Sequence, residues 1–521
     1  MKAFGYSYSN CSFHRLYFWL ICLAGSSCWG LQANAAEWNI QPRLSLSGTY
    51  TDNVRLGGMG GFGGFGGGSG SEFITQINPG VRIMGEGRRF NANVGYTSNN
   101  LIFARNERMF MRHLLNANGT AEILKERFFV DGRASISQQN AFLFGPPAFD
   151  NANLTGNLRD IRTWSISPYA RHRFKNLASG ELRYVRSAIS SSAQQFFSNT
   201  VDSVNFSMNS GSAFRTLGWG INYNHTKIDR ERSGVSLGTL ELERSAGTLR
   251  YVITPQFSLI GTGGYERNSF ISIRGKSSSH FWTAGFSWVP TTRTNVNASA
   301  GQRFFGNTYA ASIDHRTRRT VWNLSYVEDI TTFGQQSMLG ASIINPGNLG
   351  QFLPGLQDGG QLLDQGLPLA FSDPNNFLTN RLFLLRRLQA SLVLQGRKNS
   401  LVFRAFNFSR KAFTPDEEDE PLIGIGNAFL TRNTTQTGGN VLLNHRLTAL
   451  TSANFNFGYT RIRFDMTDQA DELYIFMLSL NKRITPNVNG SLLYRHHRRE
   501  SNRIASDFSA NAITATLNMN F

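Results

Sequence analysis

The segments that join the predicted strands fall into two length classes, and the two classes alternate along the chain. Short connections include the pairs at 125–126, 254–255 and 485–486, whereas long connections include residues 141–157 and 413–431. Barrels of the outer membrane have this arrangement, because their periplasmic turns are short and their extracellular loops are long. Ten short turns and two termini predict an all-β, transmembrane antiparallel β-barrel of about 22 strands, within a range of 20–24.

Each predicted strand has one apolar face and one small polar face. In residues 217–224 the odd positions are Leu, Trp, Ile and Tyr, and the even positions are Gly, Gly, Asn and Asn. A secreted β-sandwich also alternates in this way, but its outward faces tend to carry charge. Small polar residues suit a barrel wall that faces water on the inside and lipid on the outside.

Tyrosine recurs in a similar context after seven of the short turns. Tyrosine at one height on many strands is typical of the aromatic girdle at a membrane interface, where the ring tolerates lipid and the hydroxyl group meets water. A soluble barrel would have no reason to repeat this residue, so the repeat favours a membrane barrel. The seven residues are Tyr96, Tyr184, Tyr223, Tyr265, Tyr326, Tyr459 and Tyr494.

The first 35 residues read as a secretory signal peptide. Basic residues precede the apolar run "LYFWLICLAG", and "ANAAEW" offers a small-residue cleavage site near Ala35. All three cysteines lie inside this peptide, so the remaining chain has neither a disulfide nor a cysteine metal site. No stretch of 18 uncharged apolar residues occurs, which argues against a helical membrane protein. We therefore expect one domain, residues 36–521, in the outer membrane of a Gram-negative bacterium.

The chain ends on the apolar face of its last predicted strand, at Phe521. A closed barrel has no free edge, so the last strand is expected to pair with the first. The terminal aromatic residue looks like the signal by which the barrel-assembly machinery recognises outer-membrane proteins. The first strand begins almost at the predicted mature N-terminus, so we also expect no plug domain.

Arginine dominates a basic chain. Removal of the signal peptide leaves 50 basic and 34 acidic residues, a net charge of +16. Arginines on the water-filled side of the wall would attract anions and repel small cations. The alternative is that these arginines only brace the wall by pairing with residues such as Asp131 and Glu181. The lumen candidates, by strand parity, are Arg133, Arg171, Arg173, Arg183, Arg303, Arg404 and Arg495.

A second set of basic residues lies two positions beyond several of the repeated tyrosines, on the lipid face just above the girdle. Lipopolysaccharide phosphates lie at this height, and the planar guanidinium group pairs well with phosphate. Arg186, Arg267 and Arg461 are therefore candidates for contact with lipopolysaccharide.

The remaining motifs give little support for bound metals or catalysis. The acidic run Asp416, Glu417, Glu418, Asp419 and Glu420 is a weak candidate for Ca²⁺ or for divalent bridges to lipopolysaccharide, and the alternative is a solvated charged loop. Residues 234–238, "GVSLG", match a nucleophile motif but are expected in a loop between strands, without the following helix. The neighbouring His496 and His497 would point to opposite faces. We expect no enzyme activity, no cofactor and no nucleic-acid partner.

Two stretches, "SIDHRTRRTVWNLSYVEDI" and "RRLQASLVLQGRKNS", resemble outer-membrane proteins associated with the PEP-CTERM system, within the group of β-barrel porins. The resemblance implies an exosortase and exopolysaccharide context and supplies no active site. The glycine-rich segment 57–71 is expected in the first external loop, and residues 331–380 form the longest loop. The predicted function is a conduit for anionic solutes or an acidic exopolysaccharide. The alternative is a non-conducting anchor for surface polysaccharide or sorted proteins, and a loop-borne hydrolase is a remote third option.

Overall fold

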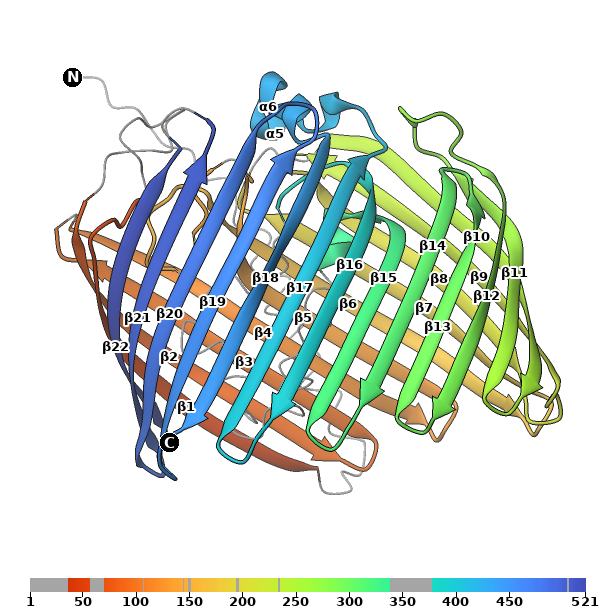
Figure 1. Cartoon of the computed structure of the whole chain (residues 1–521), viewed down its shortest axis with the longest axis horizontal. Coiled ribbons are helices and arrows are strands. Elements are labelled where there is room, and N and C mark those ends of the chain that lie inside the picture. Colours follow the sequence, from red (N-terminus) through yellow and green to blue (C-terminus); the bar gives the residue numbers. More distant parts are fainter. Residues whose placement is uncertain are drawn as a thin grey trace, which may run out of the picture.

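One closed antiparallel sheet of 22 strands forms the protein in the computed structural model (Figure 1). The structure describes residues 36–56, 70–105, 107–143, 145–148, 151–193, 196–232, 235–337, 377–503 and 506–521. The first and last strands pair in register from Arg43 opposite Asn520 to Thr51 opposite Ala512, which closes the sheet. The predicted fold class and strand number are confirmed. The predicted signal peptide and most of the glycine-rich segment lie outside the described residues.

The strands follow chain order around the barrel. They are β1 Glu37–Thr51, β2 Glu72–Gly87, β3 Phe90–Phe103, β4 Arg108–Leu124, β5 Phe128–Asn140, β6 Leu158–Phe174, β7 Ala178–Ser191, β8 Ser198–Ser210, β9 Leu217–Arg232, β10 Val235–Thr254, β11 Phe257–Asn268, β12 Ser279–Thr291, β13 Thr294–Arg303, β14 Gly306–Arg316, β15 Thr320–Thr332, β16 Leu382–Gln395, β17 Asn399–Ala412, β18 Asn433–Arg446, β19 Thr451–Phe464, β20 Ala470–Thr485, β21 Val488–Ser501 and β22 Phe508–Asn520.

The two classes of connection lie mostly at opposite ends of the barrel, but the end with the long loops also has three short connections, between β3 and β4, between β9 and β10, and between β13 and β14. The other short turns lie at the end where β1 begins and β22 stops, which corresponds to the periplasmic side of an outer-membrane barrel (Figure 1). Residues 211–216, between β8 and β9, form a turn with little sequence signal. One predicted loop is wrong: residues 230–238 belong mostly to a long hairpin, because β9 runs to Arg232 and β10 starts at Val235.

The loop between β17 and β18 contains the helical segments of this region. They are the 3₁₀ turn η3 Asp416–Glu418, the helix α5 Glu420–Ile423 and the helix α6 Ile425–Leu430. Both α-helices are short, and α6 ends one residue before Thr431. In the described residues we found no helix long and apolar enough to cross a membrane.

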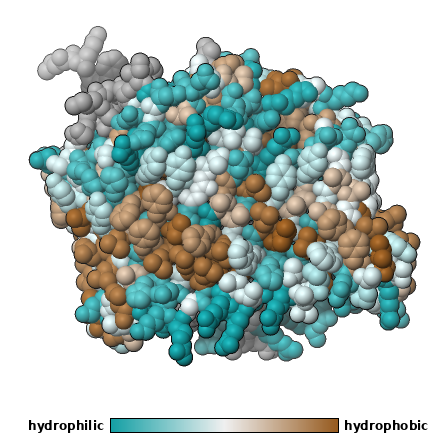
Figure 2. All heavy atoms as spheres, viewed as in Figure 1, coloured by the Kyte–Doolittle hydropathy of each residue, from teal (hydrophilic) through white to brown (hydrophobic). Residues whose placement is uncertain are grey.

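Large apolar side chains form a belt on the outer wall. Trp282, Trp322, Leu388 and Ile513 belong to this exposed set, with 56%, 47%, 40% and 52% of their surface accessible. Figure 2 shows the belt as a brown zone with hydrophilic side chains above and below it. No other part of the described chain covers this belt on the outer wall. Membrane lipid would cover it in an outer-membrane barrel.

The seam between β1 and β22 is made mainly by backbone pairing. The hydroxyl groups of Thr49 and Thr514 are 2.9 Å apart on the inner side, and Asn511 contacts Asp52 near the outer end. Phe521 adds one bond, from its N–H to the carbonyl of Pro42 at 2.9 Å, while 70% of its surface stays exposed. Its ring therefore contributes little to the stability of the folded barrel.

This exposure leads to a prediction for assembly. Replacing Phe521 with Ala should lower the yield of folded barrel in cells several-fold, because the residue predicted to act as the assembly signal is lost while the pairing of β1 with β22 is kept. Heat-modifiable gel migration of the membrane fraction measures that yield. The same variant refolded into detergent should melt within a few degrees of the wild type, since a surface substitution changes stability by about 0.5 kcal/mol. Equal cellular yields would remove the role of Phe521 as a signal.

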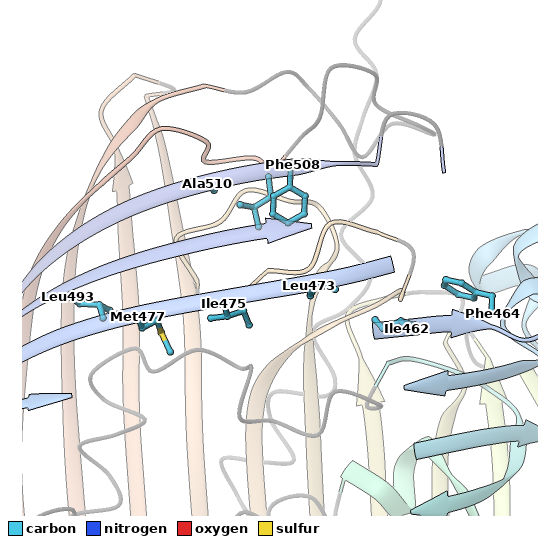
Figure 3. Packing of buried hydrophobic residues seen from close by; sticks show 9 residues of the cluster. Ile462, Phe464, Leu473, Ile475, Met477, Leu493, Phe508 and Ala510 are labelled. Carbon is cyan, nitrogen blue, oxygen red and sulfur yellow. The ribbon is translucent and has the colours of Figure 1, made fainter. Parts of the chain in front are cut away.

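Apolar packing also occurs on the inner wall, at the extracellular end. Figure 3 shows a cluster on β19–β22 whose side chains project toward loops inside the rim. Leu56, Leu143 and Leu430, from three different loops, pack against it. The members on the strands are Ile462, Phe464, Leu473, Ile475, Met477, Leu493, Phe508 and Ala510. The long loops therefore fold inward at this end.

Candidate functional site

Four extracellular loops meet inside the rim of the barrel, and we call their described residues the loop cap. The cap comprises residues 141–157 between β5 and β6, 192–197 between β7 and β8, 333–381 between β15 and β16, and 413–432 between β17 and β18, with the gaps stated above. One buried apolar cluster draws on all four loops and on inward side chains of β6 and β7: Ala141, Phe142, Ile161, Ile189, Phe196, Phe333, Leu378 and Leu422.

Contacts of the cap join walls that are far apart around the barrel. The side chain of Arg230, on β9, pairs with Glu418 at 2.7 Å, and Arg499, on β21, donates to the carbonyl of Gly145 at 3.0 Å. Gly334 lies close to β7, since a Cβ added to it would be 3.0 Å from the side chain of Ile189. These contacts cross the interior, so the described loops span the extracellular end of the lumen.

Arg381 is the buried centre of the cap. Its guanidinium group lies 2.7 Å from a carboxylate oxygen of Asp416 and 3.4 Å from Asp419, and it donates to the carbonyl of Ala428 at 3.0 Å. Asp419 also accepts hydrogen bonds from Thr379 and from the backbone of Asn380, both at 2.7 Å. We call Arg381, Asp416 and Asp419 the cap latch, because they fix the β15–β16 loop to the β17–β18 loop.

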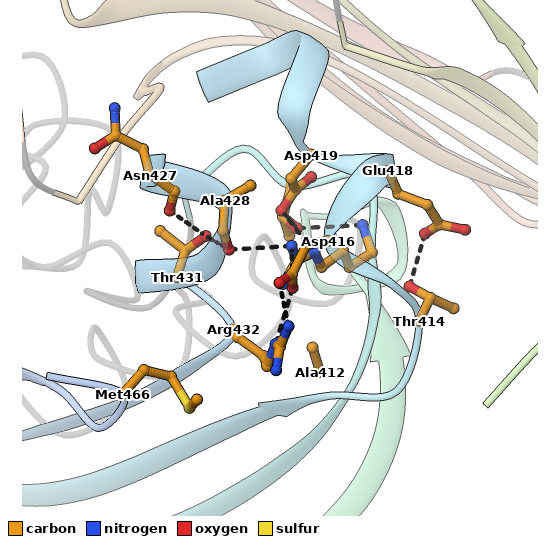
Figure 4. A network of polar contacts seen from close by, with 12 residues as sticks. Ala412, Thr414, Asp416, Glu418, Asp419, Asn427, Ala428, Thr431, Arg432 and Met466 are labelled. Atoms are coloured by element: carbon orange, nitrogen blue, oxygen red, sulfur yellow. Dashed lines mark hydrogen bonds and ion pairs between the residues drawn. The ribbon is translucent and has the colours of Figure 1, made fainter. Parts of the chain in front are cut away.

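Two further contacts extend the cap latch. Arg432 pairs with Asp416 through two nitrogens, one of them at 2.9 Å, as drawn in Figure 4. Asn380 accepts a hydrogen bond from the backbone N–H of Phe197 at 2.7 Å, which ties the β7–β8 loop to the same centre.

The acidic run therefore differs from both sequence interpretations. Asp416, Glu418 and Asp419 pair with arginine or accept hydrogen bonds inside the cap, and Asp419 is only 1% exposed. Within the described part of the chain, no group of three or more His, Asp or Glu side chains is placed to hold a metal ion. The placement does not support a calcium site, and it also corrects the solvated-loop alternative, because the loop around Asp416 is anchored.

The electrostatics of Asp416 predict how the cap responds to acid. Burial opposes ionisation, but hydrogen bonds from Arg432 and the charge of Arg381 outweigh it and lower the pKa of Asp416. Because the pKa of Asp416 is lower in the folded than in the unfolded protein, its ionised form stabilises the cap fully above the unfolded-state pKa of about 3.9. This stabilisation is lost as the pH falls through the folded-state pKa. Burial raises the pKa of the neighbouring Asp419, which favours the folded cap as the pH falls. Amide hydrogen exchange of residues 414–432, after correction for intrinsic rates, should therefore be no faster at pH 5 than at pH 7. Faster opening at pH 5 would contradict this assignment.

Below the cap, the lumen wall is lined mainly by neutral polar side chains. Hydroxyl and amide groups bond across neighbouring strands, as in Thr248 with Thr262 at 3.0 Å and Asn297 with Ser312 at 3.2 Å. Such pairs face the interior, because the adjacent residues on the same strands belong to the exposed apolar belt. This wall therefore presents hydroxyl and amide groups to the lumen.

Three of the seven arginines predicted to face the lumen pair with carboxylates. Arg171 lies 2.7 Å from Glu181, and Arg183 lies 2.9 Å from Glu181 and 2.8 Å from Asp131. Arg303 lies 2.8 Å from Glu266, which is almost completely buried. For these three residues the structure agrees with the bracing alternative, including both acidic partners that the sequence suggested.

Three of the remaining arginines, Arg133, Arg173 and Arg404, differ from this pattern. Arg133 and Arg173 are exposed on the inner side of β5 and β6, and Arg404 is partly buried on the inner side of β17. No described residue forms an ion pair or hydrogen bond with their side chains. Arg495 is 3% exposed beside the apolar cluster under the cap, away from open lumen. Arg133, Arg173 and Arg404, which we call the lumen arginines, thus keep an uncompensated positive charge.

On the outer wall, the repeated tyrosines bond to polar side chains of neighbouring strands. Tyr223 donates to Glu243 at 3.1 Å, Tyr326 to Glu328 at 2.5 Å and Tyr494 to Asn511 at 2.9 Å. Tyr96 bonds to His113, and Tyr184 bonds to Asp202. The phenol oxygens therefore mark the height at which the outer wall becomes polar, as expected of a girdle.

The basic residues above the girdle lie beside acidic groups of neighbouring strands. Arg186 lies 3.8 Å from Asp202, and Arg461 lies 3.7 Å from Glu472. Arg267 is the register partner of Glu243. The side chains of Arg186 and Arg461 are about half exposed, at 53% and 55%. Their contact with lipopolysaccharide stays a prediction.

The structure also shows the positions of the adjacent histidines and of the "GVSLG" segment. His496 contacts Asn511 on the outer side, whereas His497 is 2% exposed on the inner side, so the two rings point apart as predicted. In "GVSLG", residues 235–238 belong to β10 and not to a loop.

No protein-family model and no curated protein matches this sequence. Solved structures do match. The FrpB iron transporter of Neisseria meningitidis, in its apoprotein form, has a TM-score of 0.50 and 10% identity, over 92% of this chain and 81% of that one. The siderophore receptor PirA of Pseudomonas aeruginosa has a TM-score of 0.44 and 10% identity, over 93% and 80%. The fold is that of an outer-membrane β-barrel. At this identity the likeness concerns the fold alone.

Proposed function

We propose that the protein is an outer-membrane conduit for anionic solutes, closed at rest by the loop cap. The observation that carries the proposal is the set of uncompensated lumen arginines on a wall of neutral polar side chains. Fixed positive charges in a low-dielectric wall raise the local concentration of anions and exclude cations. The paired residues Arg171, Arg183 and Arg303 brace the wall and add little to this field.

The proposed permeant class is an acidic solute or a segment of an acidic exopolysaccharide. The resemblance to PEP-CTERM-associated outer-membrane proteins supports the exopolysaccharide, and the hydroxyl and amide groups of the wall suit a carbohydrate chain. No catalytic step is assigned to the protein. The similar solved structures are an iron transporter and a siderophore receptor, and at 10% identity their roles do not extend to this chain.

The experiment is a reversal-potential measurement in planar bilayers without lipopolysaccharide, under a salt gradient. The wild type should pass current with anion preference. Replacing Arg133, Arg173 and Arg404 together with Gln should weaken or abolish that preference. The matched control replaces Arg186, Arg267 and Arg461 with Gln, which removes the same charge from the outer wall and should leave selectivity unchanged. A cation-selective wild type would contradict the proposal.

A second function is favoured by the loop cap itself. Loops that pack into a shared apolar cluster and a buried ion-pair centre are what a non-conducting anchor would need, because they present a fixed outer surface. In this case the outer loops would hold surface polysaccharide or sorted proteins. A bilayer that stays silent even after the cap latch is broken would favour this anchor over the conduit.

A further inference from the structure

Three cations from three different elements converge on the outer wall near the extracellular ends of β16 and β17. Arg386 lies on β16, Lys411 on β17 and Arg274 in the loop between β11 and β12. By strand parity, Arg386 and Lys411 share the face of Leu388 and Phe403, which are 40% and 39% exposed in the apolar belt. The three cations therefore face the membrane side of the wall and not the lumen.

The height of this site is fixed by the strand register. Arg386 lies opposite Glu328, two residues beyond the girdle residue Tyr326, whose hydroxyl group donates to the same Glu328. On the outer face of its strand, Arg386 is the first charged residue above the apolar belt. In Figure 2 the wall above the belt is covered by hydrophilic side chains on the face that carries β15–β19. This is the level of lipid headgroups in the outer leaflet.

Arg274 is brought to the site by its backbone and by its own side chain. The N–H of Ile273 donates to the carbonyl of Phe413 at 2.8 Å, and the Nε of Arg274 donates to the carbonyl of Ala412 at 2.8 Å. Its Nη2 donates to Asn433 at 2.7 Å, and no described residue accepts from Nη1. The guanidinium group is thus held beside Lys411 with one nitrogen left for a ligand.

A packed phenylalanine group keeps this loop in place. The ring of Phe413 lies 5.8 Å from that of Phe270 and 5.7 Å from that of Phe304, which belongs to the short connection between β13 and β14. Because this hairpin has the two shortest strands of the barrel, the β11–β12 loop can pass above it and reach β17. The cationic site is therefore preformed.

The charges at the site do not balance. Glu328 lies 3.2 Å from Arg386 and is the carboxylate in the group, while the nearby Asp465 is engaged by Arg463 at 2.8 Å. Lys411 lies close enough to both Arg386 and Arg274 to be repelled by their positive charges. Burial, followed by the charges of Arg386 and Arg432, lowers the pKa of Arg274. Cations held this close together without enough carboxylates favour a bound anion with several acceptor oxygens.

We propose that Arg274, Arg386 and Lys411 form a binding site for a phosphate group of an outer-leaflet glycolipid. A phosphate monoester offers oxygens to all three cations, and a lipid phosphate would lie at the height of the site. Ile271 and Ile273 support a lipid as its carrier, because they are 81% and 43% exposed on the same loop, next to Arg274. The site is distinct from Arg186, Arg267 and Arg461, and it does not depend on the conduit.

The test measures lipid binding to the full-length barrel in detergent by native mass spectrometry. The probe is diphosphorylated lipid A, with lipid A lacking phosphate and inorganic phosphate as comparison ligands. Replacing Arg274, Arg386 and Lys411 together with Gln should weaken binding of the diphosphorylated lipid about tenfold or more, since charge-assisted hydrogen bonds are the strong ones. Lipid without phosphate should bind weakly to both proteins.

The control replaces Arg133, Arg173 and Arg404 with Gln, which removes three positive charges from the lumen. This variant should bind diphosphorylated lipid A like the wild type. Heat-modifiable migration checks that each variant is folded, and Lys411→Gln alone provides a milder variant. Equal binding by the triple variant and the wild type would overturn the site. Displacement of the lipid by equimolar inorganic phosphate would overturn its assignment to a lipid.

Discussion

Replacing Arg381 with Ala is expected to release the loop cap while the barrel stays folded. The substitution leaves Asp419 and part of Asp416 without their cation in a buried setting, where both carboxylates now lie within 3.4 Å of the guanidinium group. Breaking a buried ion pair by removing one partner costs about 3–5 kcal/mol. The loss falls on the contacts between loops, because the strand ladders contain none of these atoms. Amide hydrogen exchange of residues 377–381 and 414–432 should rise by about two orders of magnitude or more.

Two variants control this measurement. Arg319→Ala removes an arginine from a periplasmic turn and should leave exchange in the cap unchanged. Arg381→Met combined with Asp416→Asn and Asp419→Asn removes the charges together, and we expect it to recover much of the protection, because a buried pair replaced as a unit is often near neutral in stability. Unchanged exchange in Arg381→Ala would show that the apolar cluster alone holds the cap.

Replacing Asp471 with Ala is the second substitution with a large expected effect. Asp471 pairs with Arg499 at 2.7 Å on the inner side of β20 and β21, and both side chains are at most 2% exposed. Arg499 also donates to the carbonyl of Gly145, so the pair anchors the β5–β6 loop to the opposite wall. Loss of the carboxylate leaves a buried guanidinium group and should cost about 3–5 kcal/mol.

Limited proteolysis of the folded protein measures this effect. Residues 141–157 should become the first site of cleavage in Asp471→Ala, whereas the wild type should resist at that loop. Asp471→Leu with Arg499→Met is the matched control, and we expect it to be cleaved more slowly than the single variant. A double-mutant cycle with no coupling between the two positions would remove the pair from the account of the cap.

The barrel could be predicted from sequence because its rules are local. Alternation along residues 217–224, the repeated tyrosines and the spacing of turns each depend on neighbours within a few residues, and the closed sheet follows from them. Glu181 and Asp131 could even be named as partners of inward-facing arginines, since strand parity places them on the same face. The turn at 211–216 could not be predicted, because its residues carry a weak turn signal. The opposite holds at 230–238, where serine and glycine residues are typical of a loop but the strands continue into a long hairpin.

The loop cap could not be predicted in the same way, since its contacts join residues far apart in the chain. Arg381 and Asp419 are separated by a whole hairpin, and nothing local shows that the acidic run is buried. One signal was present in the apolar runs "RLFLL" and "LYIFML", at 381–385 and 473–478. Continuous apolar residues imply that both faces of a strand are covered. At 473–478 the inner face packs against the loops and the outer face continues the apolar belt. At 381–385 both faces are buried, because Leu382 and Leu384 pack in a cluster with Phe270 and Phe413.

Single-channel recording of the wild type and of Arg381→Ala in planar bilayers tests the central claim most directly. If the protein is an anion conduit closed by the loop cap, the wild type should show brief anion-selective openings. The variant should then stay open for a much larger fraction of the time, with the same selectivity. Silence from both proteins, after both are shown to be folded in the bilayer, or a cation-selective current from either, would contradict the conduit.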